Sequence, residues 1–328
     1  MTGALRRLAP GLALLLVGAL AARGVAAVAG VSGLLVAVAL GAAAANGVGV
    51  PERFEAGLAT GSLWLGAGIV LMGASVRLGT VLSAGGRVLL VVVVTLTTAV
   101  LVVEVLSRTV FGLGGRLGSL LAAGAGICGV SAVVAVAGAI RAREDQIAYA
   151  AATVLLFDAL TLVAFPVLGD LLGLSDIVFG VWAGVSMFST GPVVAAGFAH
   201  SPTAGQWATV TKLSRNALVG VVVLGYASVY ATTDGDGPTL RTLWDEFPKF
   251  ILGFLALALV ASLGAFTPAQ RTAIEHGYDW LFLLAFVGLG TEIRIADLRE
   301  TGAGPALAVF VALVAASVVS LALLTLLF

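Results

Sequence analysis

Charged side chains are scarce in this chain. Only 10% of its 328 residues are Asp, Glu, Lys or Arg, whereas 60% are hydrophobic. A typical soluble domain carries roughly 25% charged residues. Mean hydropathy is +1.13, so the sequence predicts a polytopic membrane protein and excludes a soluble one. Because the formal net charge is zero, there is no electrostatic case for binding nucleic acid.

Cysteine, histidine and lysine are also rare. The single Cys128 cannot form an internal disulfide, and His200 and His276 lack metal-ligand spacing. The sequence has no Gly-rich phosphate loop, no metal-ligating cluster and no nucleophile–base pair, so we expect neither an enzyme nor a cofactor. The only lysines are Lys212 and Lys249, in a chain dominated by Ala, Gly and Val. That bias is typical of a GC-rich prokaryote, and it predicts a protein of the prokaryotic cell (inner) membrane.

Long apolar runs divide the chain into about eleven candidate spans of roughly 20 residues each. The run at 9–23 follows two arginines, as in a signal peptide, but further runs come directly after it, which favours a first spanning helix. Since the longest polar connection, 232–249, is a turn-rich loop, we predict one transmembrane domain over residues 1–328. The predicted spans are 9–23, 26–47, 58–76, 87–107, 117–140, 147–169, 177–199, 206–231, 248–266, 279–293 and 303–327.

A short internal repeat relates residues 70–85 to residues 287–302. The two segments would lie in the third and tenth spans, so an odd number of crossings separates them and they would run in opposite senses. We therefore predict an all-α fold with two inverted five-helix repeats, about 26–170 and 177–328; a chance match in an apolar chain is the alternative. The matched residues are Gly73 with Gly290, Arg77 with Arg294, and Gly85 with Gly302.

Two glycine-rich segments, 124–131 and 288–291, lie inside predicted spans. Glycine weakens a helix interior by roughly 1 kcal/mol relative to alanine, and non-helical backbone at membrane depth must line protein or a water-filled cavity. We expect two broken helices, with half-helix ends facing a substrate; close helix packing is the simpler explanation of the glycines. The predicted binding residues are Gly126, Cys128, Gly129, Ser131, Gly290 and Thr291.

A basic pair lies in the otherwise apolar span 206–231. Lys212 and Arg215 share one helix face, and Asn216 lies one turn beyond Lys212. Buried cations are costly and usually face a cavity or a partner. These three residues are predicted to bind an anion, with Arg215 offering a bidentate fork; alternatively, Asp158 or Glu104 neutralises the pair and the charges lock the bundle.

Three acidic residues are candidate coupling groups or counter-ions. Asp158 is flanked by apolar residues, Glu104 lies near the end of its span, and Glu292 lies near the mouth of the tenth span. The sequence FSTGP at 188–192 predicts a kink in the span 177–199, because proline removes a backbone hydrogen bond. A packing role for this kink is as plausible as a role in lining a site.

Five motifs resemble the UPF0324 membrane proteins, a family labelled as sulfate exporters. In family order they are GICGVSA (126–132), FGVWAG (179–184), VVAAG (193–197), ATVTKLSR (208–215) and GLGT (288–291). The resemblance implies a fold like that of cation–proton antiporters and anion transporters, with inverted five-helix repeats and crossed, unwound helices. In one place the chain departs from the family pattern, since Phe188-Ser189-Thr190 stands where relatives often have His-Asp-Thr.

The sequence therefore predicts a secondary transporter or exporter of a small sulfate- or sulfonate-like anion, coupled to H+ or Na+. The rivals are a cation–proton antiporter that uses Asp158 and, less favoured, a membrane channel. We expect the lipid bilayer, the anion and the coupling ion as partners. A homodimer is expected as well, because related folds pair through a scaffold domain.

Overall fold

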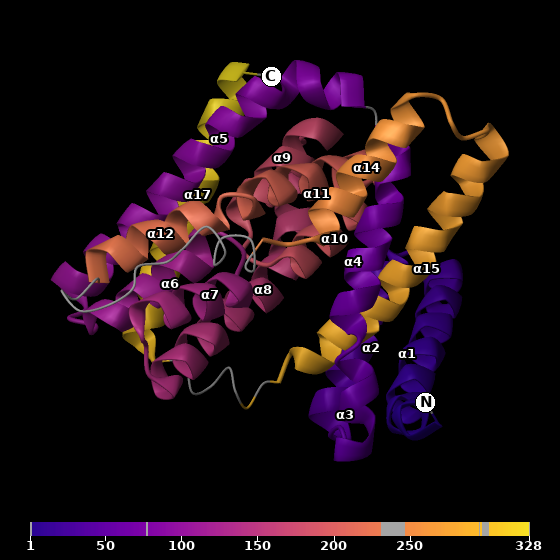
Figure 1. The fold of residues 1–328 in the computed structure, drawn as a ribbon, viewed down its shortest axis with the longest axis horizontal. Coiled ribbons are helices and arrows are strands. Elements are labelled where there is room, and N and C mark those ends of the chain that lie inside the picture. The colour runs from indigo at the N-terminus through magenta and orange to yellow at the C-terminus, as the bar shows by residue number, and fades with distance from the viewer. Residues whose placement is uncertain (1, 77, 231–246, 295, 297–301, 328) are drawn as a thin grey trace. The chain divides into compact units, whose positions relative to one another are not determined.

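The computed structural model describes residues 2–76, 78–230, 247–294, 296 and 302–327, and every regular element in this part of the chain is a helix (Figure 1). This confirms the predicted all-α class. Within these residues, six helical segments are long and apolar enough to cross a membrane, fewer than the eleven crossings predicted. They are Arg6–Ala29, Glu52–Ser75, Ala84–Val110, Glu144–Leu171, Pro202–Tyr230 and Ala303–Leu327. Most of the loop 232–249, together with Arg77 and part of the repeat at 287–302, lies outside the described residues.

The chain forms two compact units. The first comprises residues 1–84 and 249–295. In it, glycines allow close backbone approach: a Cβ on Gly41 would lie 2.9 Å from the Cα of Gly290, and one on Gly11 would lie 2.6 Å from that of Gly57. Its helices are α1 (Thr2–Ala29), α2 (Gly33–Gly47), α3 (Glu52–Leu58), α4 (Gly61–Met72), α14 (Phe250–Ser262) and α15 (Pro268–Glu292).

Helix α15 is continuous through residues 288–291, so the predicted break there is wrong. Gly288 faces Gly61 of α4, and Gly290 faces the backbone of α2. Thr291 Oγ1 donates to the Gly288 carbonyl at 2.7 Å, which satisfies the hydroxyl within its own helix. These glycines serve helix packing, the alternative that the sequence left open.

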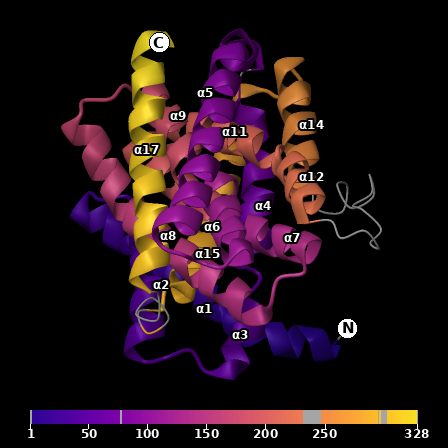
Figure 2. The same cartoon turned by 90° about the vertical axis from the view of Figure 1, so that its left-hand side faces the viewer.

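The second unit comprises residues 85–248 and 296–328. Figure 2 shows α17 as a long helix, and it packs against α6, α8 and α9. Trp182 Nε1 donates to the Ser317 carbonyl at 3.2 Å, and the Ser186 and Ser320 hydroxyls are 3.1 Å apart. The unit contains most of α5 (Leu78–Val105), the π-helical turn η2 (Leu106–Val110), α6 (Gly115–Gly126), α7 (Val130–Ile140), α8 (Glu144–Leu171), α9 (Asp176–Ser186), α10 (Thr190–His200), α11 (Pro202–Asn216), α12 (Val219–Tyr230) and α17 (Ala303–Leu327).

Helices α9 and α10 double back as a hairpin. The ring of Phe179, early in α9, stacks on that of His200, the last residue of α10, with centroids 4.1 Å apart. Gly180 of α9 and Gly197 of α10 both pack on Ala204 and Ala208 of α11. The chain therefore reverses at residues 187–189.

Helices α6 and α7 form a second hairpin. Gly304 in the first turn of α17 lies against Phe111, just before α6, and the neighbouring Gly302 N–H donates to the Tyr149 hydroxyl in α8. Only residues 141–143 join α7 to α8. The end of α7 thus returns to the end of the unit where α6 begins, and the chain reverses at residues 127–129.

These hairpins correct the prediction that residues 117–140 form one broken crossing and residues 177–199 form one kinked crossing. Each arm has 11 or 12 residues, or about 17 Å of helix, roughly half the hydrocarbon thickness of a bilayer. Backbone conformation explains the reversal, because Gly129 has φ 72° and Met187 and Ser189 are extended. Apolar length alone does not distinguish a hairpin of two short helices from one long helix.

Candidate functional site

The tips of the two hairpins touch at Gly129 and Ser189. A Cβ atom on Gly129 would collide with Ser189 Oγ, and the positive φ of Gly129 independently disfavours any other residue. Asp158 lies at the midpoint of α8. Its Oδ1 accepts a hydrogen bond from the Ser189 N–H at 2.9 Å. The two hairpins therefore meet at the level of the middle of the 28-residue helix α8.

Lys212 of α11 joins the two tips. Its Nζ donates to the Ile127 carbonyl of the first hairpin at 2.7 Å and to the Met187 carbonyl of the second at 3.1 Å. The side chain is fully buried. One ammonium thus binds backbone from both reversals.

Arg215 repeats this arrangement one turn later. Its Nε donates to Gly126 O at 2.6 Å and its Nη2 to Ala125 O, both in the first hairpin. Nη1 donates to Val185 O and to Met187 O of the second hairpin, each at 2.8 Å. Arg215 is also fully buried, so its guanidinium is saturated by carbonyls from two separate segments.

The acceptors of Lys212 and Arg215 are the last carbonyls of α6 and α9 and those just beyond them. A helix C-terminus leaves four carbonyls without partners inside the helix and carries about half a negative charge. The two cations offset this charge at both helix ends. No ion pair within 4 Å joins either cation to a carboxylate of the described residues. The basic pair therefore locks the bundle through carbonyls, without a direct ion pair to Asp158 or Glu104.

Asn216 and Asp158 hold consecutive residues at the start of α10. Asn216 Nδ2 donates to Thr190 Oγ1 at 3.0 Å, next to the Ser189 N–H that Asp158 binds. The two side chains are only 3% and 4% exposed. Both therefore fix the second tip from within the buried core.

The second helix of each hairpin begins at the tips. The first N–H groups of a helix lack partners within it and attract anions. At the start of α7, Ser131 is exposed and Val130 is partly exposed, whereas Cys128 is 8% exposed. Thr190, at the start of α10, is partly exposed. Val130, Ser131 and Thr190, together with the partly exposed Ser189, make the accessible part of the tip region, whereas Cys128 is buried.

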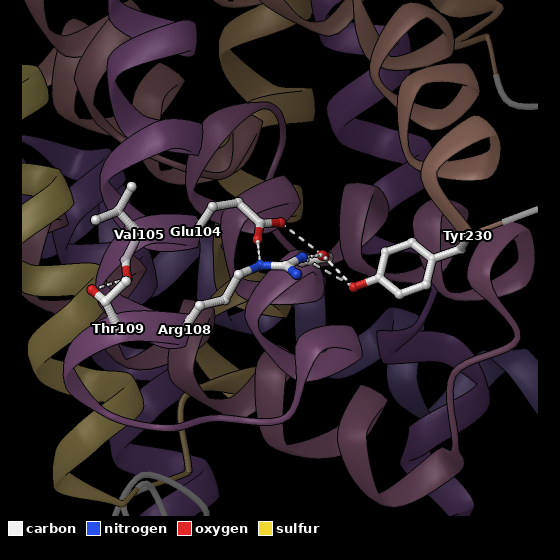
Figure 3. A network of polar contacts seen from close by, with 6 residues as sticks. Glu104, Val105, Arg108, Thr109 and Tyr230 are labelled. Carbon is white, nitrogen blue, oxygen red and sulfur yellow. Dashed lines mark hydrogen bonds and ion pairs between the residues drawn. The ribbon is translucent and has the colours of Figure 1, made fainter.

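Glu104 lies in a separate polar network (Figure 3). Its carboxylate accepts from Arg108 Nε at 2.7 Å and from Ser119 Oγ at 2.6 Å. Arg108 Nη2 and Ser119 Oγ both contact the Tyr230 hydroxyl, at 3.2 and 3.0 Å. The network ties α5 and η2 to the first half of α6 and to the end of α12, away from the hairpin tips.

The remaining predicted site residues, Gly290, Thr291 and Glu292, belong to α15 of the first unit. Their predicted contact with a substrate stays a prediction. His200 closes the base of the second hairpin, with Nδ1 3.1 Å from Asp170 and Nε2 3.8 Å from Asp176.

Sequence reasoning did not select Met187, Ser189 or Thr190 as site residues. Their signal was present in the FSTGP segment, where two hydroxyl residues precede glycine and proline. Such a segment is typical of a helix start, with Ser189 at the N-cap and Pro192 in the first turn. It was interpreted as a kink because the flanking residues are uniformly apolar.

Comparison with known proteins finds similar membrane proteins. Residues 10–309 match the family model described as conserved hypothetical protein 698. A UPF0324 membrane protein of Nitratidesulfovibrio vulgaris is 36% identical over 275 residues, covering 82% of this chain and 76% of that protein. UPF0324 membrane proteins of Bacillus cereus (31% over 272 residues, 82% and 79% covered) and Clostridium tetani (30% over 256 residues, 74% and 74% covered) are also similar. No solved structure matches the chain.

Proposed function

Because this chain belongs to the UPF0324 family of membrane proteins, we propose that it is a secondary active transporter that moves a small anion by alternating access. The observation that carries this proposal is the contact between two hairpin tips, joined by Lys212 and Arg215. Backbone that leaves the helix at membrane depth is tolerated where it lines a cavity, and it marks substrate sites in transporters.

In the membrane, the two hairpins would re-enter from opposite faces and end near the midplane. The sequence predicted inverted repeats over about 26–170 and 177–328. The inverted pair proposed here is narrower, residues 115–171 and 176–230, since each is a hairpin followed by a long helix. Asp158 lies midway along α8, and Asn216 lies at the corresponding point between α11 and α12. A site at the crossing of two such repeats can be exposed to either face by moving one group of helices against another.

Charge favours an anion as the substrate. The buried charged residues among those described are Lys212, Arg215 and Asp158, two cations and one carboxylate. The starts of α7 and α10 add two positive dipole ends at the tips. A sulfate- or sulfonate-like anion would meet the N–H groups and hydroxyl of Val130 and Ser131, with Gly126, Cys128 and Gly129 shaping the approach. Lys212 and Arg215 would act on it mainly by their potential, because their donors already bind carbonyls.

The test is flux in proteoliposomes. We expect saturable uptake or exchange of sulfate or a small sulfonate, dependent on a H+ or Na+ gradient, and abolished in Lys212→Ala. Ser214→Ala is the matched control, because among the described residues Ser214 Oγ bonds only within its own helix, to Val210 O at 2.9 Å. Unchanged uptake of every tested anion in Lys212→Ala would refute the anion proposal. Non-saturable flux would indicate a channel, and Asp158-dependent exchange of cations for protons without any anion flux would indicate the antiporter.

A further inference from the structure

Two buried oxygens, one from α8 and one from α11, lie beside the start of α10 and have no hydrogen-bond partner among the described residues. They are Asp158 Oδ2 and Asn216 Oδ1. The other polar atom of each side chain is fixed on consecutive residues of the tip, at Ser189 N and at Thr190 Oγ1. Both orphan oxygens are therefore held beside the same two residues.

These oxygens can only accept. An ionised carboxylate has no donor, and the Asn216 amide donates through Nδ2 to Thr190. A buried polar atom that has no hydrogen-bond partner in the protein indicates a bound water or ion. A buried carboxylate requires a cation more strongly. No Lys or Arg of the described residues lies within 4 Å of Asp158, and Lys212 and Arg215 attract its charge only from further away.

Neighbouring hydroxyls complete an oxygen-rich surrounding. Ser189 Oγ and Thr190 Oγ1 belong to the same two residues, and both residues are partly exposed, which gives an ion a route to the tip. Carbonyl, carboxylate and hydroxyl oxygens are the ligands of hard cations. Since Asp158 is the one buried carboxylate in the described part of the chain, a monovalent ion matches the charge better than a divalent ion.

We propose that Asp158 Oδ2 and Asn216 Oδ1, with the hydroxyls of Ser189 and Thr190, bind Na+. The bound ion would tie α8 and α11 to the start of α10 and so stabilise one position of the second hairpin tip. The role of this ion in coupling transport rests on the proposed function. The binding of Na+ at this site does not.

Binding is measured without transport, on the purified full-length protein. Thermal unfolding is followed in rising NaCl, with KCl and choline chloride at equal ionic strength. We expect Tm to rise saturably with Na+ and to change much less with K+ or choline, because a ligand that binds only the folded state stabilises it. Equal responses to all three salts would overturn the proposal, and would leave a bridging water as the occupant.

Variants locate the site. Asn216→Ala and Asp158→Asn should each raise the Na+ concentration for half-maximal stabilisation by about tenfold or more, with Ser214→Ala unchanged. Because these variants could fail to fold, Asn216→Asp provides the opposite test: the added carboxylate should lower that concentration by about tenfold. An Asn216→Asp protein with the wild-type Na+ response would contradict the assignment.

The two proposals fail separately. Selective Na+ stabilisation without any anion flux would sustain this site and refute the anion transporter. Anion flux that persists in Na+-free medium, with no selective Na+ stabilisation, would refute this site and leave the transporter standing.

Discussion

Arg215 and Met187 lie on different segments of the second unit, yet Arg215 Nη1 donates to the Met187 carbonyl at 2.8 Å, and Lys212 Nζ donates to the same oxygen at 3.1 Å. Each cation also binds the first hairpin, at residues 125–127. One short stretch of α11 therefore fixes both chain reversals. The structural role of the basic pair follows from this shared acceptor.

Replacing Arg215 with alanine should destabilise the folded protein by about 3 kcal/mol or more, because several buried carbonyls lose their donor at once. Arg215→Lys should recover only part of this, since an ammonium lacks the planar fork. Thermal unfolding in detergent measures the change. Arg143→Ala is the control, because Arg143 is exposed and its ion pair among the described residues is with the exposed Asp145. A loss of stability in Arg215→Ala no larger than in this control would contradict the clamp.

A methyl group at Gly129 should disrupt the contact between the tips. Gly129→Ala meets Ser189 Oγ and also strains the positive φ, so we expect a loss of about 1–3 kcal/mol in stability and impaired flux. The double variant Gly129→Ala/Ser189→Gly should regain the part due to collision. Gly138→Ala is the control, because Gly138 lies in the same hairpin with open space around it, and this variant should behave as wild type. If Ser189→Gly does not rescue Gly129→Ala at all, the tips do not touch.

The start of α7 should be reachable from water and occupied by substrate. In a Cys128→Ser background, Ser131→Cys should react with a polar thiol reagent, and a transported anion should slow the reaction. Val134→Cys, one turn further along α7 and also exposed, should show no protection. A modification rate of Ser131→Cys that is independent of saturating anion would remove Ser131 from the site.

Glu104 should matter for stability and not for coupling. Its two carboxylate oxygens already accept from Arg108 and Ser119, so Glu104→Gln should lower stability by about 1 kcal/mol while the ion dependence of flux is preserved. Tyr230→Phe removes another member of the network and should have a similar, smaller effect. A changed coupling ratio in Glu104→Gln would restore it as a coupling group.

The sequence predicted the membrane class, the helical fold and the interruption of the helix in the GICGVS segment, because composition and glycine chemistry are local properties. It singled out Lys212, Arg215, Asn216 and Asp158 for the same reason, since buried polar groups in apolar helices are rare. It did not predict which way the chain turns after Gly129 or Ser189. That direction is set by backbone dihedrals and by packing on α11, which a run of apolar residues does not encode.

The prediction of a helix break at residues 288–291 was wrong for the same reason, because the sequence does not encode the backbone dihedrals there. Glycine is used in α15 for close approach to α2 and α4, whereas in the first hairpin Gly129 takes a conformation closed to other residues. Both uses give similar sequence patterns. Only the backbone conformation distinguishes them.

The central claim is that two hairpins enter the membrane from opposite faces and meet at their tips. Cysteine labelling with an impermeant reagent in intact cells and inverted vesicles tests it, using four exposed positions at the hairpin bases: Gly114, Arg143, Ser175 and Thr203. We predict that Ser175→Cys and Thr203→Cys are labelled from one face, and Gly114→Cys and Arg143→Cys from the other. Labelling of Ser175→Cys and Thr203→Cys from opposite faces would contradict the account, because the segment between them would then cross the membrane.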